Sequence, residues 1–458
     1  MQGVDENGAQ ASGRRCRGQP PGGLYDAAAV LLRRSGGYWM RPVSPGMASF
    51  AALRRAAASR FLEQGLPTRA ERSWRLWPIE AVTRVPFGLA PPLAVYAGLG
   101  SWLCEVVPTL DGERRVALVD GRPIPEGLIY MAGDMEIRSL AQAAGAAELD
   151  EQFGRCADIQ QGFVALNTAL FSDGLFILIP RGAIVDEPLH VIVVAAAAST
   201  PSMSHPRILV IAGASSTATI VETFVGLPKG EGDAPTLTNA VTEVMLGEGA
   251  TLDHLRVQDE WAGGYHVGAV SVRQSGGSRY RSQVVSLGSA ASRLDLDVLV
   301  DGLGAECVLD GLWLAGGRQR FDHRLQVVHA RPRTRSLLRY VGVAGDAARS
   351  VIGGRVDVRR GAAGAEARLE TRGVLLSREA RVDARPSLEV DVETEEASIA
   401  RLQEETLCLG GDGIEEFLKG ALDRIDLLPL RKHLASRILK VGDTHPVRKP
   451  AITKTFWG

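Results

Sequence analysis

Histidine and cysteine are the residues of this chain best suited to bind a metal ion. The chain has eight histidines and five cysteines, and imidazole and thiolate are soft ligands that suit zinc and iron. The cysteines are scattered and never form a CxxC pair, which is typical of a reducing compartment and argues against a disulfide framework. Each cysteine could equally be a small buried hydrophobic residue. They are Cys16, Cys104, Cys156, Cys307 and Cys408.

Two of the histidines lie on one predicted strand. His323 and His329 are six residues apart, so a regular strand directs both to the same face but separates them by about 20 Å. They cannot bind one ion together unless the chain turns between them. Either could ligate with another residue, and we retain His329 and Cys307 as candidate metal ligands. The sequence does not bring together the histidines of other passes: His190, His205, His254 and His266.

Motifs for nucleotide binding and hydrolysis are absent from the sequence. It has no GxxxxGK[ST], GxSxG or HExxH segment. Gly247-Glu248-Gly249 lacks the third glycine of a dinucleotide fingerprint. A dispersed Ser/His/Asp triad stays open, although nothing marks one. We interpret the acidic run from Glu393 to Glu396 as a solvated boundary, and we expect no enzyme.

The elements that must position these residues are mainly β-strands. From His205 to Val392 the chain alternates apolar and polar residues, the period that buries one face of a strand. Clear passes are residues 293–298, 356–359 and 388–393. Paired glycines at 263–264, 276–277, 316–317 and 353–354 predict turns between passes. This pattern fits a β-solenoid, barrel or sandwich and does not choose among them.

Helices are predicted on both sides of the β region. Helical spacing indicates a helix from Ser49 that ends near Gly65, a second at about 137–147 and a third at about 399–409. Two further helical faces follow: Ile414, Phe417, Leu418, Ala421, Leu422 and Ile425, then Leu430, Leu434 and Ile438. Residues 175–180 predict a buried strand.

The predicted regions are an extension at 1–46, a helical or mixed region at 47–160, a β core at 161–393 and a helical region with a tail at 394–458. Because the extension is rich in Gly, Pro and Arg, we expect it to be disordered, or Met47 to be the functional start. A chain of 458 residues should contain more than one core.

Charge and hydropathy argue against two classes of partner, although a local charged patch stays open. The net charge is -1 and only 5% of residues are aromatic, so no broad attraction to nucleic acid is expected. The longest apolar stretch, residues 191–198, is far shorter than the ~20 residues that span a bilayer. We expect a soluble, cytoplasmic protein that binds neither nucleic acid nor membrane.

Several segments, in order, resemble the SufD subunit of the SUF iron–sulfur cluster assembly system. They are similar to the family's GLPT, ALNTA-x-FSDG, HPR, VE, LTNAVTE, VEHxxP and PQLEI segments. In this chain they begin at Gly65, Ala165, His205, Val221, Leu237, Val328 and Pro386. The likeness runs from about Ala51 to Ile438.

The resemblance implies a right-handed parallel β-helix flanked by helical regions. It also implies a non-enzymatic scaffold that pairs with a SufB-like paralogue and docks a SufC-like ATPase. A transient iron–sulfur cluster and possible reduced flavin would belong to the assembled complex, with this chain supporting iron acquisition. An edge strand carrying Leu388, Val390 and Val392 would pair with the paralogue, unless the C-terminal helices cap it. Phe417, Leu418 and Leu422 would dock the ATPase.

The chain departs from the family where the proposed chemistry lies. The family's CSHGAT segment, with its Cys and His, is missing after Val390, and the docking helix is shortened. A second hypothesis is therefore a degenerate SufD relative that keeps the β-helix and its edge but supplies no cluster ligand. A third hypothesis is an independent β-helix enzyme such as a polysaccharide lyase or hydrolase. The sequence shows no carboxylate or histidine cluster that would indicate such an activity.

Overall fold

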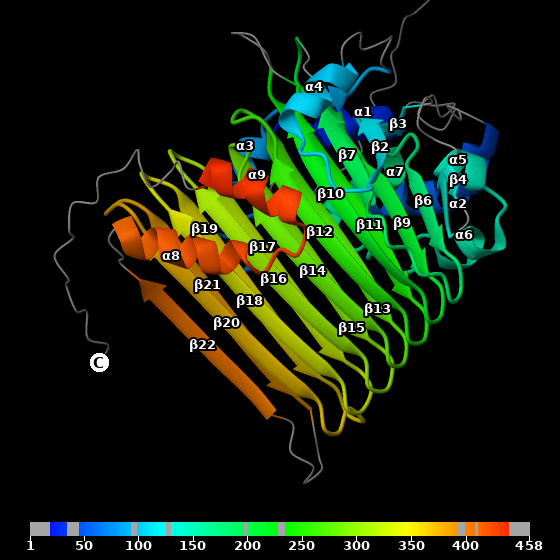
Figure 1. Cartoon of the computed structure of the whole chain (residues 1–458). Helices are drawn as coiled ribbons and strands as arrows, with labels where there is room; N and C mark the ends of the chain where they lie inside the picture. The colour runs from blue at the N-terminus through cyan, green and yellow to red at the C-terminus, as the bar shows by residue number, and fades with distance from the viewer. Residues whose placement is uncertain are drawn as a thin grey trace, which may run out of the picture.

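Two long, mainly parallel sheets form the body of the molecule (Figure 1). The computed structural model describes residues 19–33, 45–92, 99–124, 130–132, 134–196, 199–227, 234–391, 399–407 and 411–438. From β9 onward, odd-numbered strands form the first sheet and even-numbered strands the second. Each strand pairs in parallel with the next strand but one. The chain is therefore a parallel β-solenoid of about seven turns, as the resemblance implied.

The first sheet contains strands from both the N-terminal region and the solenoid. They are β1 Gly88–Leu89, β4 Tyr130–Ala132, β5 Met135–Ser139, β6 Leu175–Ile179, β8 Ser202–Ser204, β9 Arg207–Ala212, β11 Thr236–Leu246, β13 Tyr265–Gln274, β15 Ala291–Val300, β17 Arg320–His329, β19 Arg349–Val358 and β21 Arg381–Val390.

The second sheet lies across the solenoid interior from the first. Its strands are β2 Arg114–Val119, β3 Arg122–Pro123, β7 Leu189–Ala195, β10 Thr217–Gly226, β12 Thr251–Asp259, β14 Arg279–Ser286, β16 Glu306–Ala315, β18 Arg335–Ala344, β20 Glu366–Leu375 and β22 Ile399–Leu407.

The helices lie before, between and after the strands. They are α1 Leu24–Arg33, the 3-10 helix η2 Pro45–Phe50, α2 Ala51–Gln64, α3 Ile79–Thr83, α4 Leu99–Val106, α5 Leu140–Ala143, α6 Ala147–Gln152, α7 Gly162–Leu170, α8 Gly411–Leu422 and α9 Leu428–Ile438. Each helix in the described part of the chain is too short or too polar to span a bilayer.

Alternation along each strand produces the solenoid interior. On β15, Leu294, Leu296 and Val298 are buried in the main core, while Arg293 and Asp297 face outward. Tight turns join the strands, and at Gly277 the backbone takes a φ of 62°, which glycine adopts without steric cost. The period of two predicted from the sequence is thus the period that separates core from surface.

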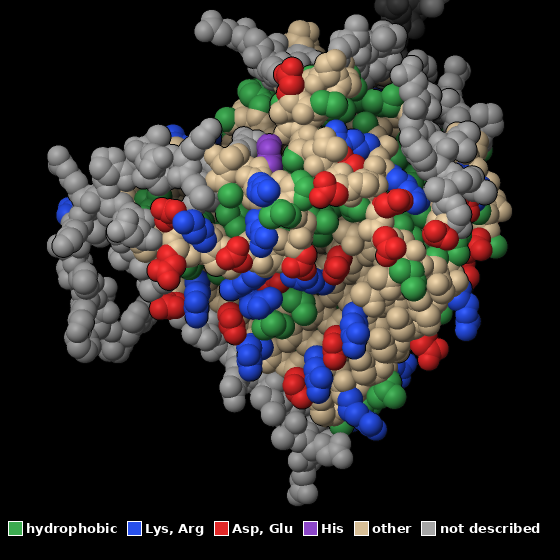
Figure 2. Space-filling view, in the orientation of Figure 1, with side chains coloured by type: hydrophobic (Ala, Val, Ile, Leu, Met, Phe, Trp, Pro, Cys, Tyr) green, Lys and Arg blue, Asp and Glu red, His purple; other side chains and the backbone are tan. Residues whose placement is uncertain are grey.

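Helices α8 and α9 cross the outer face of the second sheet (Figure 1). Their apolar residues complete a cluster with outward-facing residues of β12 to β20, including Leu312 and Val341. Below the helices, acidic and basic side chains are interspersed on this face (Figure 2). Arg339, for example, pairs with Asp310 at 2.7 Å.

The N-terminal helical region is fixed to the first sheet. The indole Nε1 of Trp77 donates to the carbonyl of Ser292 at 3.3 Å. The guanidinium of Arg293 lies 3.6 Å from the ring centroid of Trp74, a cation–π contact that is worth most when desolvated. These contacts bring residues 73–77 over β15.

Four sequence predictions need correction. Residues 24–33, inside the stretch expected to be disordered, form α1, because Leu24, Tyr25 and Ala28 are buried in the N-terminal cluster. Residues 137–147 begin as strand β5, which pairs with β6, and only then become helical. The helix expected at 399–409 is strand β22, whose residues 399–407 continue the ladder of β20. Gly353 and Gly354 lie within β19 rather than in a turn.

The observed strands extend beyond the predicted β core. β2 precedes its start at residue 161, and β22 follows its end at residue 393. The helix predicted from Ser49 is confirmed as α2, and the buried strand at 175–180 as β6. Val392 and the acidic run at 393–396 lie outside the described residues.

Candidate functional site

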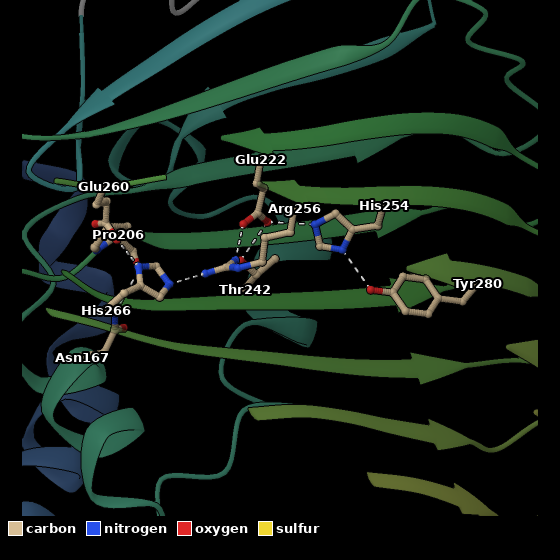
Figure 3. Close-up of polar contacts among 9 residues, drawn as sticks. All are labelled: Asn167, Pro206, Glu222, Thr242, His254, Arg256, Glu260, His266 and Tyr280. Carbon is tan, nitrogen blue, oxygen red and sulfur yellow. Dashed lines mark hydrogen bonds and ion pairs between the residues drawn. The ribbon is translucent and has the colours of Figure 1, made fainter. Parts of the chain in front are cut away.

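A buried polar network occupies the solenoid interior (Figure 3). Its centre is Glu222 on β10, which is fully buried. Glu222 accepts from Arg256 Nη1 at 2.5 Å, His254 Nε2 at 3.0 Å and Thr242 Oγ1 at 2.9 Å. Both carboxylate oxygens are therefore engaged, so the buried charge is paired and hydrogen-bonded, as it must be to persist there.

The electrostatics of Glu222 follow from these partners. Burial alone raises the pKa of a carboxyl group, but Arg256, His254 and Thr242 outweigh burial and lower the pKa of Glu222 to about 2. The guanidinium of Arg256 also lies 4.0 Å from the ring centroid of Phe224. Glu222 is thus held as a carboxylate at every physiological pH.

The network extends in two directions from the Glu222–Arg256 pair, through His254 on the Glu222 side and through His266 on the Arg256 side. On one side, His254 Nδ1 lies 2.9 Å from the hydroxyl of Tyr280. On the other, Arg256 Nη2 lies 3.1 Å from His266 Nε2, and His266 Nδ1 lies 2.8 Å from Glu260. Because arginine can only donate, His266 Nε2 accepts and its proton lies on Nδ1, facing Glu260.

The two candidate metal ligands lie further along the same interior. His329 Nδ1 is 2.7 Å from Thr334 Oγ1, and its Nε2 is 2.8 Å from Ser336 Oγ. Ser336 is in register with Cys307 on the neighbouring strand. Burial lowers the pKa of His329 to about 4 and raises the pKa of Cys307 to about 12. Both side chains are neutral, and both ring nitrogens of His329 are already hydrogen-bonded.

Three further histidines are also hydrogen-bonded to protein groups. His190 contacts Glu113 at 2.7 Å and Thr223 at 2.8 Å, and His323 contacts Ser286 at 2.9 Å. His205 Nδ1 lies 3.2 Å from Asn239. Over the described part of the chain, no three His, Cys, Asp or Glu residues form a group that could hold a metal ion. The sequence did not foresee that His254 and His266 are linked through Glu222 and Arg256.

Native thiol reactivity tests this placement. Cys104 is exposed and Cys307 is buried, and the thiolate is the reactive form. We expect iodoacetamide at pH 8 to alkylate Cys104 within minutes while Cys307 stays unmodified, measured by peptide mass spectrometry. In urea both should react alike. Equal rates in the native chain would contradict a buried Cys307.

A second feature is the C-terminal end of the solenoid. β21 ends the first sheet and β22 ends the second, and neither has a further strand beside it among the described residues. Leu388 is partly buried against the core, whereas the side chain of Val390 is 49% exposed. Two of the three predicted edge residues therefore lie on the terminal strand.

The predicted docking residues of α8 pack against their own chain. Leu418 and Leu422 are each only 2% exposed, and Phe417 is partly buried beside them. Packing on the second sheet accounts for these apolar positions. The exposed face of α8 instead carries Glu415, Glu416 and Lys419. A partner that bound α8 as it lies here would meet that charged face.

The connection between α8 and α9 is fixed to the sheet by polar contacts. Arg281 pairs with Asp426 and also donates to the carbonyl of Arg424 at 2.6 Å. Gln283 donates to the same carbonyl. Both donors come from β14, so one strand positions the turn between the two helices.

Comparison with known proteins places this architecture in a family. Residues 193–408 match the SUF system FeS cluster assembly SufBD core domain, and residues 44–191 match the SufBD protein N-terminal region. The chain therefore belongs to the SufBD family of iron–sulfur cluster assembly proteins.

Individual relatives agree with this family. An iron–sulfur cluster assembly SufBD family protein of Synechocystis is 24% identical over 381 residues, which is 80% of this chain and 83% of that protein. The iron–sulfur cluster assembly protein SufD of Escherichia coli is 23% identical over 76% of this chain and 79% of its own. SufD of Bacillus subtilis is 27% identical over 50% of this chain and 51% of its own.

Proposed function

We propose that this chain is a SufD-like scaffold subunit that pairs with a SufB-like paralogue and docks a SufC-like ATPase in the cytoplasm. The observation that carries the proposal is the family match on a solenoid whose terminal strands are unpaired among the described residues. An unpaired strand edge is a template for another chain. A paralogue built on the same solenoid supplies a strand of the right kind.

The scaffold does no chemistry of its own in this proposal. Iron and sulfide are cargo, assembled into a cluster in the complex, and ATP hydrolysis belongs to the ATPase. The polar interior supports this assignment, because its charged groups form hydrogen bonds and ion pairs with one another and do not point into an open cavity. Reduced flavin, if it participates, would bind the assembled complex.

Docking of the ATPase is proposed through the charged, exposed face of α8 and the neighbouring α9. Glu415, Glu416 and Lys419 are available there, and Leu428 at the start of α9 is 45% exposed. Leu418 and Leu422 would act indirectly, by holding α8 on the sheet. In this proposal Leu418 and Leu422 do not contact the ATPase directly, in contrast to the expectation from the sequence.

Co-expression tests the proposal directly. We expect the full chain, produced anaerobically with the SufB-like and SufC-like proteins of the same source, to give a native mass spectrum that contains all three chains. Omitting the SufB-like chain is the control for pairing, and omitting the SufC-like chain is the control for docking. A chain that stays alone in every mixture would overturn the scaffold role.

A degenerate relative is the second candidate. It is favoured by the lack of a metal-binding group in the described residues and by the buried, neutral state of Cys307 and His329. In the same mass spectra this candidate predicts a pair with the SufB-like chain that recruits no ATPase through this subunit.

A further inference from the structure

A groove of about 980 Å³ lies on the outer face of the first sheet. Residues 64–67, 71–74 and 160–162 border it, and the outward positions of β15, β17, β19 and β21 line it. Its volume is at the upper end of the range found for small-molecule sites. The groove is separate from the interior network and from α8 and α9.

The floor of the groove has a gap at Gly353. A Cβ atom placed on Gly353 would meet nothing within 4 Å, and its φ is not in the left-handed region. Neither packing nor backbone conformation therefore requires glycine at this position of β19. A glycine in a strand interior often marks close approach by a ligand. Gly354 differs, because its Cβ would lie 2.6 Å from Leu369.

Two arginines flank this gap. Arg324 on β17 and Arg385 on β21 are each in register with Gly353, and all three line the groove. Neighbouring strands are about 4.8 Å apart, so the two Cα atoms are about 10 Å apart. Side chains of arginine length can converge from both sides on a group seated above Gly353.

Neither arginine is neutralised by a short ion pair. Among the described residues Arg324 pairs only with Asp295, at 4.0 Å, and Asp295 already binds Arg293 at 2.7 Å. Asp297 and Asp322 lie close enough for Arg324 to lower their pKa values, so part of its charge is offset. Arg385 has no ion pair within the described residues. Arg355, two residues along β19, is by contrast paired with Asp357 at 2.8 Å and Glu389 at 2.6 Å. The available positive charge is thus concentrated on either side of Gly353.

The other end of the groove offers hydrogen-bond acceptors. Asp322 binds Arg293 at 2.6 Å through Oδ2, while its buried Oδ1 has no partner. Asp297 accepts from Gln161 at 3.2 Å. Burial raises the pKa of both carboxyl groups to about 6. The groove therefore has a basic end near β21 and an acceptor end near β15.

We propose that this groove binds a small organic anion, whose phosphate or carboxylate group sits above Gly353 between Arg324 and Arg385. The rest of the molecule lies toward Asp297 and Asp322, where hydroxyl or amine groups would find acceptors. Guanidinium groups are the preferred donors for both anions, because their geometry matches two oxygens at once. This binding needs no partner chain, so it can hold or fail independently of the scaffold role.

Calorimetric titration of the full chain tests the proposal, with inorganic phosphate and succinate as separate probes at constant ionic strength. We expect at least one probe to bind. Gly353→Leu, which fills the gap, and Arg385→Gln, which removes one guanidinium, should each weaken that binding by at least about tenfold. Binding of phosphate alone would indicate a phosphate ester as the natural ligand, and binding of succinate alone a carboxylate.

Arg349→Gln is the matched control. Arg349 is an exposed arginine on β19, the strand of Gly353, and it does not line the groove. It should bind as the wild type does. Thermal unfolding shows whether each variant is folded, and Arg385→Gln decides the matter if Gly353→Leu is not. Failure of the wild type to bind either probe, or unchanged binding in the folded groove variants, would overturn the proposal.

Discussion

Glu222→Gln is expected to lower the free energy of unfolding by about 3–5 kcal/mol, the usual effect of removing one partner of a buried ion pair. The substitution keeps the size of the side chain but leaves Arg256 as a buried cation without its carboxylate. Arg256 is only 2% exposed, so water cannot replace the lost charge. Urea denaturation followed by circular dichroism measures the change.

The same ion pair predicts how the free energy of unfolding changes with pH. Because the folded pKa of Glu222 is about 2 and the ordinary value is 4.5, its contribution is fully present above about pH 4.5 and is lost as the pH falls toward 2. The shift corresponds to about 3 kcal/mol. We therefore expect the wild type to lose more stability than Glu222→Gln does between pH 5 and pH 2.5.

Glu306→Gln is the control for this experiment. Glu306 makes only partly exposed ion pairs, with Arg335 at 3.4 Å and Arg279 at 3.6 Å, and such pairs contribute at most about 1 kcal/mol. Combining Glu222→Gln with Arg256→Met should cost less than the sum of the two single changes, since the unpaired cation is then gone. A Glu222→Gln variant within 1 kcal/mol of the wild type would contradict the role of the network.

The segments that carry the family resemblance also supply a second buried ion pair, which is separate from the Glu222 network. Arg207 of the HPR segment pairs with Glu243 of the LTNAVTE segment, and both are fully buried. Glu243 also accepts from the backbone N–H groups of Gly154 and Cys156 at 3.0 Å. These motif residues join the N-terminal region to the solenoid. These motif residues are therefore explained by a structural role, and they do not indicate a catalytic site.

The alternation of apolar and polar residues could predict the strands and their buried faces, because this pattern depends only on residues that are close in the sequence. The meeting of His254 and His266 depends on the register between separate strands, which alternation does not fix. The only available signal was His254-x-Arg256-x-Gln258, three polar residues on the face that should be apolar. The helical faces of α8 and α9 were also visible, but periodicity cannot say whether a chain's own sheet or a partner covers them.

The sequence predicted an edge strand at Leu388 and Val390, and the hydrogen-bond pattern of β21 adds detail that the sequence lacked. Arg381 N–H donates to Ala348, and Asp391 N–H donates to Val358. Backbone N–H groups alternate in direction along a strand. The N–H groups of odd-numbered residues of β21 therefore point to β19, and those of even-numbered residues point to the free edge. Pro386, which has no N–H, falls on the free edge, where proline is tolerated.

Leu388 and Val390 therefore hold the edge donors on the C-terminal side of Pro386. A strand from a SufB-like partner would pair there, which matches the segment predicted from the sequence. The proposal can be tested without disturbing the fold, because Val390 donates to no neighbouring strand in this geometry and its side chain is 49% exposed.

Val390→Pro is expected to weaken pairing with the SufB-like chain by at least about tenfold, because it removes an edge donor and restricts the backbone. Affinity would be measured by titrating the labelled SufB-like chain, and thermal unfolding should match that of the wild type. Ser387→Ala, on the same strand but with its N–H directed to β19, is the control and should pair normally. If Val390→Pro pairs as tightly as Ser387→Ala does, the partner does not add a strand at this edge, and the complex must form through another surface.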